Sequence, residues 1–192
     1  MTGVRGRPWL SLSRRSFWIG LAAGVGLSLV LREIPYINWE PVVPPVDGPL
    51  VIRHDAKGDG RFAAPRSGNR KHRGIDVAAE LGSAVRAIRS GAVLETGTHR
   101  GLGRFVKLEH NGGMTSLYAH LKDVTIEAGD RVGQGQPIGT VGKTGNARHP
   151  WITPHVHLEV VKDGDAVNPA SLGLAVAEPE PFRGEVDASG GE

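Results

Sequence analysis

The chain has 192 residues, which is enough for one domain of ordinary size with short appendages. Its 28 glycines and 13 prolines favour short strands and turns, and its lack of cysteine excludes disulfide bonds, thiolate metal sites and cysteine nucleophiles. The formal net charge of +3 is small, and much of the positive excess lies near the N-terminus, which argues against a nucleic-acid partner.

Residues 1–34 have the pattern of an export signal or a membrane anchor. Arg14 and Arg15 precede an uncharged apolar run over residues 17–31, and the arginine pair resembles a bacterial twin-arginine export signal. The run is shorter than the roughly 20 residues of a full membrane span, but no small-residue cleavage site follows it. We therefore expect an exported protein, periplasmic or facing the cell wall, anchored to the inner membrane by residues 17–31. Cleavage of the signal is the alternative.

Composition divides the rest of the chain into three segments. Residues 35–49 contain five prolines and predict an extended linker, because proline fixes φ and donates no backbone hydrogen bond. Residues 50–174 carry the features of a folded domain. Residues 175–192 have no core-forming pattern and are expected to be disordered.

Residues 50–174 contain short β-prone segments separated by glycine. Asn111-Gly112-Gly113 lies between two of them and predicts a hairpin. We therefore expect a mainly β fold, an antiparallel sheet domain of the open-sandwich or half-barrel kind with a groove, preceded by the N-terminal apolar helix. The expected strands cover residues 84–88, 92–96, 104–110, 114–120, 137–141 and 155–161.

A set of histidines and one aspartate carries the chemistry. His155 and His157 are two residues apart in an expected strand, so both side chains point to one face. His72 and Asp76 lie in a turn that leads into a strand, and His120 ends another strand. Two imidazole nitrogens, one carboxylate oxygen and one open position form the usual ligand set of a catalytic zinc ion. The pattern predicts a hydrolase that activates water at such an ion.

Four sequence blocks in these residues resemble the lysostaphin-like (LytM-type) zinc metalloendopeptidases, which cut peptidoglycan. The resemblance spans residues 70–161, roughly half of the chain. The blocks are HRGIDVAA at 72–79, LEHNGGMT with YAHL within 108–121, GDRVGQGQPIG at 129–139, and TG at 144–145 with PHVHLEV at 154–160.

The resemblance implies one Zn²⁺ ion bound by His72, Asp76 and His157. It puts His155 and His120 in the same groove without contact to the metal. We assign His155 as the general base and His120 as the acid or oxyanion partner, two roles that the sequence leaves interchangeable. The implied substrate is an amide bond in the peptide part of peptidoglycan. The implied partners are this peptide, the membrane through the N-terminal segment and a regulatory protein, with no nucleic acid.

Two alternatives remain open at this point. A catalytically silent module of the same fold would bind wall material or activate another hydrolase, but such modules often lack metal ligands that this chain has. A zinc peptidase acting on some other extracellular peptide is the second alternative. It is suggested by residues 146–153, a segment longer than is usual in the family, in which Trp151 is a candidate substrate contact.

The remaining candidates receive structural interpretations. His54 and His99 are expected in surface loops, and His110 in a structural hydrogen bond at the edge of the hairpin. Glu159 shares a strand face with His155 and His157. It either orients a ligating imidazole or pairs with a neighbouring charge.

Overall fold

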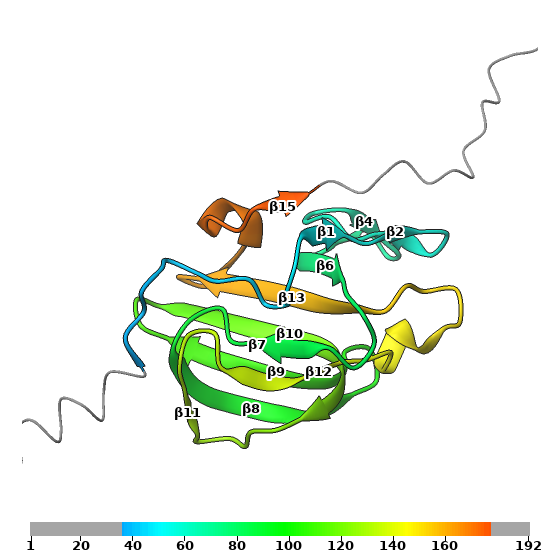
Figure 1. Ribbon diagram of the computed structural model, residues 1–192. Helices are drawn as coiled ribbons and strands as arrows, with labels where there is room; N and C mark the ends of the chain where they lie inside the picture. The colour runs from blue at the N-terminus through cyan, green and yellow to red at the C-terminus, as the bar shows by residue number, and fades with distance from the viewer. Residues whose placement is uncertain (1–35, 178–192) are drawn as a thin grey trace, which may run out of the picture. The chain divides into compact units, whose positions relative to one another are not determined.

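The longest strands of the described residues lie next to one another at the centre of one sheet (Figure 1). The computed structural model describes residues 36–177. The central strands follow one another through antiparallel ladders and are β8 (Gly91–His99), β9 (Gly103–His110), β10 (Met114–Val124) and β13 (His155–Lys162). Beyond β13 the sheet continues through β6 (Gly74–Ala78), β1 (Leu50–Ile52) and β15 (Val176–Ala177).

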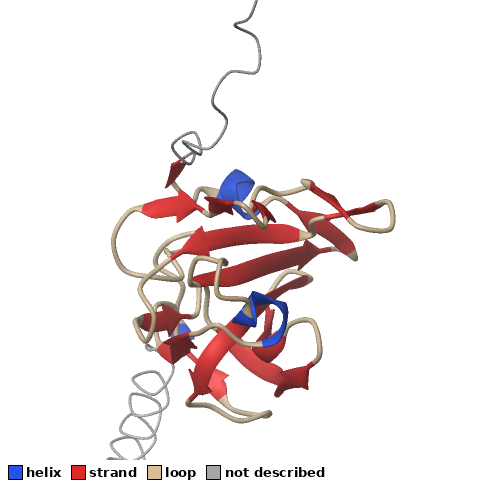
Figure 2. Ribbon diagram, turned by 90° about the vertical axis from the view of Figure 1, so that its right-hand side faces the viewer, coloured by secondary structure: helices blue, strands red, loops and turns tan. Residues whose placement is uncertain are grey.

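Shorter strands extend this framework. At one edge β11 (Arg131–Val132) pairs with β8, and β14 (Asp165–Val167) pairs with β13. The last part of β10 pairs with β12 (Pro137–Val141), and β12 also pairs with β7 (Ala84–Arg86). Two small hairpins precede β6, namely β2 (His54–Asp55) with β3 (Gly58–Asp59) and β4 (Pro65–Arg66) with β5 (Arg70–Lys71). The turns η2 (Gly145–Arg148) and η3 (Pro169–Leu172) are 3-10 helices, so strands and loops dominate the described residues (Figure 2).

The mainly β fold predicted from the sequence is confirmed. All six expected strands are present with slightly different ends, and residues 111–113 join β9 to β10 as the predicted hairpin. Apart from β7, the strands of two or three residues were not predicted, because so short a strand carries no periodic signal. One of them, β15, lies in the tail predicted to be disordered. It pairs in parallel with β1 through its backbone, which requires no apolar pattern.

The predicted N-terminal apolar helix and the arginine pair before it lie outside the described residues. Within residues 36–177 the structure contains no helix that is long and apolar enough to cross a membrane.

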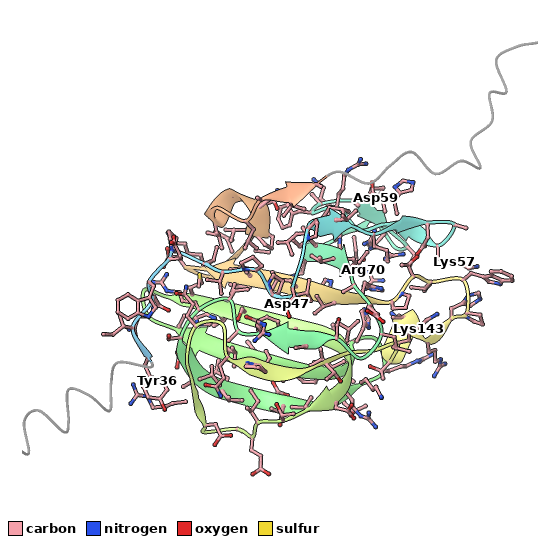
Figure 3. The ribbon with its side chains drawn as sticks, in the orientation of Figure 1. Tyr36, Asp47, Lys57, Asp59, Arg70 and Lys143 are labelled. Atoms are coloured by element: carbon pink, nitrogen blue, oxygen red, sulfur yellow. The ribbon has the colours of Figure 1, made fainter. Side chains whose placement is uncertain are left out.

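The proline-rich segment contacts the domain over its described part, residues 36–49 (Figure 3). At its start the Tyr36 ring lies under the guanidinium of Arg131, with 4.0 Å between the guanidinium carbon and the ring centroid. Further along, Val46 is buried in the core, and Asp47 accepts hydrogen bonds from Arg86. We predicted this segment as a linker. From Tyr36 onward it runs along the domain surface.

Alternation along β13 separates the core from the groove. Val156, Leu158 and Val160 are fully buried in the apolar core, and the residues between them face the opposite side. On β6, Ile75 and Val77 lie opposite Leu158 and Val156 and belong to the same core. The other face of this strand pair is therefore where the polar side chains of both strands meet.

Gly74 allows this strand pair to form. It lies opposite Glu159, and a Cβ atom at position 74 would be 2.2 Å from the carbonyl oxygen of Leu158. That oxygen belongs to the backbone of the central strand β13, so it has little freedom to move. A side chain at position 74 would therefore push β6 away from β13.

We expect Gly74→Ala to lower the free energy of unfolding by about 1–3 kcal/mol, the usual cost of overpacking. Urea denaturation measures this loss. Gly97→Ala is the matched control within a strand, because its new Cβ would first meet the ring of Phe105 at 3.3 Å, a side chain that can adjust. An equal loss in both variants would contradict the role given to Gly74.

Candidate metal centre

Asp76 and His157 face each other directly across the ladder between β6 and β13. Both side chains are buried, and the Oδ1 atom of Asp76 lies 2.9 Å from Nδ1 of His157. Because directly opposite residues point to the same side of a sheet, the register alone brings these two groups together.

His72 joins them from the turn between β5 and β6. Its backbone is fixed by hydrogen bonds with Ala63 and Ala64. Its Nε2 lies 3.2 Å from Oδ1 of Asp76 and 3.0 Å from Nδ1 of His157. Its other ring nitrogen, Nδ1, is 2.8 Å from the carbonyl oxygen of Arg61. A carbonyl oxygen only accepts, so Nδ1 carries the proton and Nε2 presents a lone pair to the cluster.

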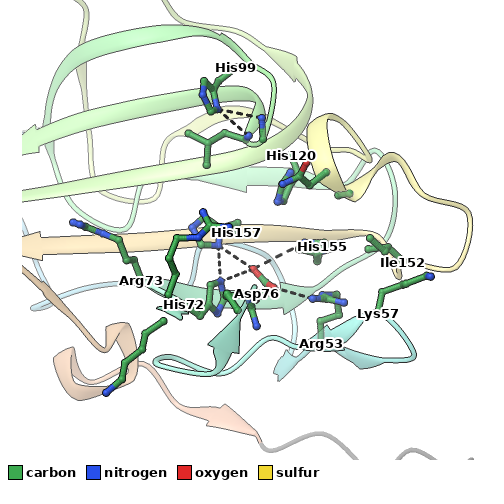
Figure 4. A pocket seen from close by; sticks show the side chains of 17 residues that line it. Arg53, Lys57, His72, Arg73, Asp76, His99, His120, Ile152, His155 and His157 are labelled. Carbon is green, nitrogen blue, oxygen red and sulfur yellow. Dashed lines mark hydrogen bonds and ion pairs between the residues drawn. The ribbon is translucent and has the colours of Figure 1, made fainter. Parts of the chain in front are cut away.

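The three converging atoms form a triangle with sides of 2.9, 3.0 and 3.2 Å. Ligands of a tetrahedral zinc ion at about 2.0–2.1 Å lie roughly 3.3 Å from one another, so the triangle has nearly the required size. Two nitrogens and one carboxylate oxygen also match the preference of zinc. The residues fit a zinc ion, and the structure brings together the three side chains predicted as its ligands (Figure 4).

Arg53 holds the other oxygen of the aspartate. Its Nη2 donates to Oδ2 of Asp76 at 3.0 Å, and its Nη1 donates to Asp55 at 2.7 Å. The guanidinium is buried, so its charge is weakly screened and keeps Oδ1 of Asp76 turned towards the histidines. Arg66 adds a second cation, with Nη2 at 3.5 Å from Oδ2.

The surroundings also fix the charge states of the cluster. Burial alone would raise the pKa of Asp76, but the hydrogen bond from His157 and the close contact of His72 hold that pKa well below its usual range. Burial disfavours protonated His157, yet Asp76 and Glu159 outweigh it and raise the pKa of His157 to about 9. A zinc ligand has to be a neutral imidazole, so metal binding at His157 would release a proton.

His155 and His120 lie beside this cluster, as predicted for the two groove histidines. The two rings are 4.9 Å apart between centroids, and Nε2 of His155 lies 4.0 Å from Oδ1 of Asp76. Their Nδ1 atoms are bound to backbone carbonyls, of Thr153 at 2.7 Å for His155 and of Thr144 at 2.9 Å for His120. Each Nε2 is therefore free to accept a proton.

Both of these histidines favour the neutral form. Burial lowers the pKa of His155 below its ordinary value. Burial, reinforced by His155 and His157, lowers the pKa of His120 to about 3. Both rings are therefore neutral with an uncommitted Nε2 beside the cation site, and the low pKa of His120 makes it the weaker base of the two.

His120 reaches the groove through an irregularity of β10. Tyr118 and Ala119 lie opposite Leu158 and His157, so regular alternation would turn residue 120 into the core. Instead His120 has a φ of +66°, and the pairing with β9 shifts register between Tyr118 and Leu121. This left-handed conformation costs a non-glycine residue about 1–3 kcal/mol and reverses the direction of the side chain.

The cluster lies in a groove with a volume of about 820 Å³. From the loop before β13, Asn146, Ala147 and Ile152 line it, so this loop forms a wall of the groove. Trp151 in the same loop is 73 % exposed and is not among the lining residues. His99, which we expected in a surface loop, lies at the end of β8 and also lines the groove.

The contacts of His110 and Glu159 can be compared with the interpretations given to them from the sequence. His110 makes the expected structural hydrogen bonds, to the carbonyl of Ser90 at 3.0 Å and to the hydroxyl of Ser116 at 2.7 Å. Glu159 combines the two interpretations given to it. It accepts a hydrogen bond from Arg73 at 2.9 Å, and its other oxygen lies 4.0 Å from Nε2 of His157.

Sequence reasoning missed the residues that hold the site from outside. Arg53, Thr144 and Thr153 act through a guanidinium and two backbone carbonyls. Asp55 connects two of them, because it binds Arg53 and accepts a hydrogen bond from the Thr153 amide at 3.0 Å. The only signal in the sequence was the charged run Arg53-His54-Asp55, directly after the apolar strand β1.

Comparisons with known proteins agree with this geometry. The sequence profile described as "Peptidase family M23" matches residues 70–169. DD-carboxypeptidase/endopeptidase Mpg of Neisseria meningitidis is 39 % identical over 109 residues, which are 57 % of this chain and 24 % of the relative. Murein hydrolase activator EnvC of Escherichia coli is 31 % identical over 125 residues, 65 % of this chain and 27 % of the relative.

Among solved structures, the catalytic domain of the antimicrobial peptidase lysostaphin from Staphylococcus simulans is similar, with a TM-score of 0.50. It is 30 % identical, and the match covers 62 % of this chain and 90 % of that domain. In contrast, the chain spans only about a quarter of the length of the two curated relatives.

We expect Arg53→Met to weaken zinc binding by about 10–100-fold, the usual effect of removing a group that orients a metal ligand. Competition with a chromogenic chelator measures the affinity, and Arg86→Met, which removes a surface pair with Asp47, is the control. Unchanged zinc affinity in folded Arg53→Met would show that Arg53 does not orient Asp76.

Proposed function

This chain belongs to peptidase family M23, and on that premise we propose that it is a zinc-dependent endopeptidase that hydrolyses amide bonds in the peptide part of bacterial peptidoglycan. The observation that carries the proposal is the triangle of His72, Asp76 and His157, with two neutral histidines next to it. Relatives of this chain are named as peptidoglycan endopeptidases.

His72, Asp76 and His157 are the three ligands for one zinc ion. Zinc held in this way lowers the pKa of bound water towards about 7 and polarises a carbonyl group. The protein contributes by fixing the ligand directions. Arg61 sets the tautomer of His72, and Arg53 fixes the carboxylate of Asp76.

His155 and His120 handle the protons of the reaction. Nε2 of His155 accepts the proton of the attacking water, because its Nδ1 is already committed to the Thr153 carbonyl. The resulting imidazolium then donates to the departing amine. His120 lines the same groove and its Nε2 is likewise uncommitted, so as the acid partner it would take up the second proton released from the attacking water and pass it to the departing amine.

We further propose that the protein works outside the cytoplasm, facing the cell wall, with residues 17–31 as the membrane anchor. The arginine pair and the apolar run that follows it support this location. Peptidoglycan lies in the same compartment, so this location and the proposed substrate agree.

The second candidate function is a silent module that activates another wall hydrolase. The similarity to a relative named as a murein hydrolase activator favours it. The complete ligand set and the two groove histidines favour an enzyme instead. The two functions differ in one result, because a silent module would release no fragments from peptidoglycan while raising the activity of another hydrolase.

With zinc restored after chelation, the full chain is expected to release soluble peptide fragments from purified peptidoglycan. His155→Ala should lower the rate constant kcat by about 10²–10⁴-fold while bound zinc stays the same, since the general base does not hold the metal. Mass spectrometry of the fragments and metal analysis provide the two readouts.

The control for this experiment is His54→Ala, which removes an exposed histidine outside the groove. Full activity of His155→Ala would refute the role of the base. Absence of fragments from the zinc-loaded wild type would refute the enzyme itself.

A further inference from the structure

Cationic side chains dominate the groove around the candidate metal centre. Among the residues that line it, six are Lys or Arg and one, Asp76, is acidic, which is a local excess of five positive charges. The whole chain has a formal excess of only three. The lining of the groove is therefore more strongly cationic than the chain as a whole. Its cationic residues are Arg53, Lys57, Arg66, Arg70, Lys71 and Arg73.

Three of these cations already have partners. Arg53 binds Asp55 and Asp76, and Arg73 binds Glu159. Arg66 lies 3.5 Å from Oδ2 of Asp76 and donates to the backbone carbonyl of Asp59 at 2.8 Å. Their charge is partly neutralised by the protein itself.

Lys57, Arg70 and Lys71 differ from these three. All are exposed, and none forms an ion pair with a carboxylate in the part of the chain that the structure describes. Arg70 donates only to the carbonyl of Ser67. We call these three residues the free rim cations.

The cations lie at both ends of the groove. Figure 4 shows Arg73 at one end of the histidine cluster and Lys57 with Ile152 at the other. Lys57 stands on the turn between β2 and β3 (Figure 3). A neighbouring hollow shares His99 with the groove, and its cations are Arg100, Arg104 and Arg148, with no acidic residue in its lining. A chain lying along the groove would meet positive charge on either side of the metal ligands.

We propose that the groove selects peptides with free carboxylates, and that the free rim cations Lys57, Arg70 and Lys71 are the residues that determine this specificity. A cleft lined by one sign of charge concentrates ligands of the opposite sign and speeds their association. The single carboxylate of the lining, Asp76, is committed to the metal site and Arg53. A bound peptide with free carboxylates would supply the balancing negative charge.

A peptide fits this groove better than an anionic polymer without peptide bonds. The cations surround a cluster built to hydrolyse an amide, and apolar Leu102, Ala147 and Ile152 line the same space. The inference rests on the proposed peptidoglycan endopeptidase and narrows its substrate to acidic stem peptides over neutral, amidated or all-glycine ones.

The test compares two synthetic stem peptides of identical sequence, one with free carboxylates and one with these groups converted to carboxamides. Binding is measured on the zinc-loaded full chain carrying His155→Ala, so that the peptides persist, and cleavage on the zinc-loaded wild type. We expect about tenfold weaker binding of the amidated peptide at low salt, with a smaller difference at high salt, since salt screens exposed charges. The value of kcat/KM should show the same preference.

The variant Lys57→Gln with Arg70→Gln and Lys71→Gln should bind both peptides equally. Lys162→Gln, at an exposed lysine of β13 outside the groove lining, is the control and should keep the full preference. Equal binding of the two peptides by the protein with all three free rim cations intact would overturn the proposal. So would a preference that survives loss of all three cations.

These outcomes separate the specificity from the enzyme. Selective binding without cleavage of either peptide would reject the proposed endopeptidase and leave the peptide specificity standing. Cleavage of both peptides at the same rate, with equal binding, would support the endopeptidase and reject the peptide specificity. If both peptides bind equally but a polyphosphate chain binds in a salt-dependent way that needs the rim cations, the groove recognises an anionic polymer and the proposal is wrong.

Discussion

The pairing of Asp76 with His157 across β6 and β13 is the contact on which the rest of the site depends. It places a carboxylate and an imidazole 2.9 Å apart, and it does so through strand register alone. A shift of one residue would turn Asp76 into the core and bring an apolar side chain to the groove, an exchange that the packing of Ile75 and Val77 opposes. The apolar core and the metal site therefore enforce the same register.

Around this pair, two features that lower the conformational stability of the protein orient polar side chains. The backbone of His120 is held in a left-handed conformation, and Arg53 is buried next to two aspartates. Neither feature is the most stable solution for a strand or a core. Arg53 orients the carboxylate of Asp76 and the backbone of His120 turns its imidazole into the same groove. This arrangement is expected where a site is preorganised for a cation and a reacting peptide.

The sequence predicted what depends on local periodicity. Alternation identified the strands and put His155 and His157 on one face, and the family resemblance selected the ligands that the structure brings together. The sequence could not predict the contact of Arg53 with Asp76, because that contact follows from the pairing of β1 with β6. The resemblance implied a groove position for His120, and its side chain lines the groove, although strand alternation alone would have turned it into the core. The contacts of residues 36–49 and of β15 could not be predicted from the sequence either. They consist of backbone hydrogen bonds and contacts of single side chains, which leave no periodic pattern.

The most direct measurement of the central claim is X-ray absorption spectroscopy at the zinc edge, on the full chain loaded with one equivalent of zinc. We expect a four-coordinate ion with two imidazole nitrogens and oxygen ligands at about 2.0–2.1 Å, and loss of one imidazole in His157→Ala. A spectrum with no imidazole contribution, or one that does not change in His157→Ala, would contradict it.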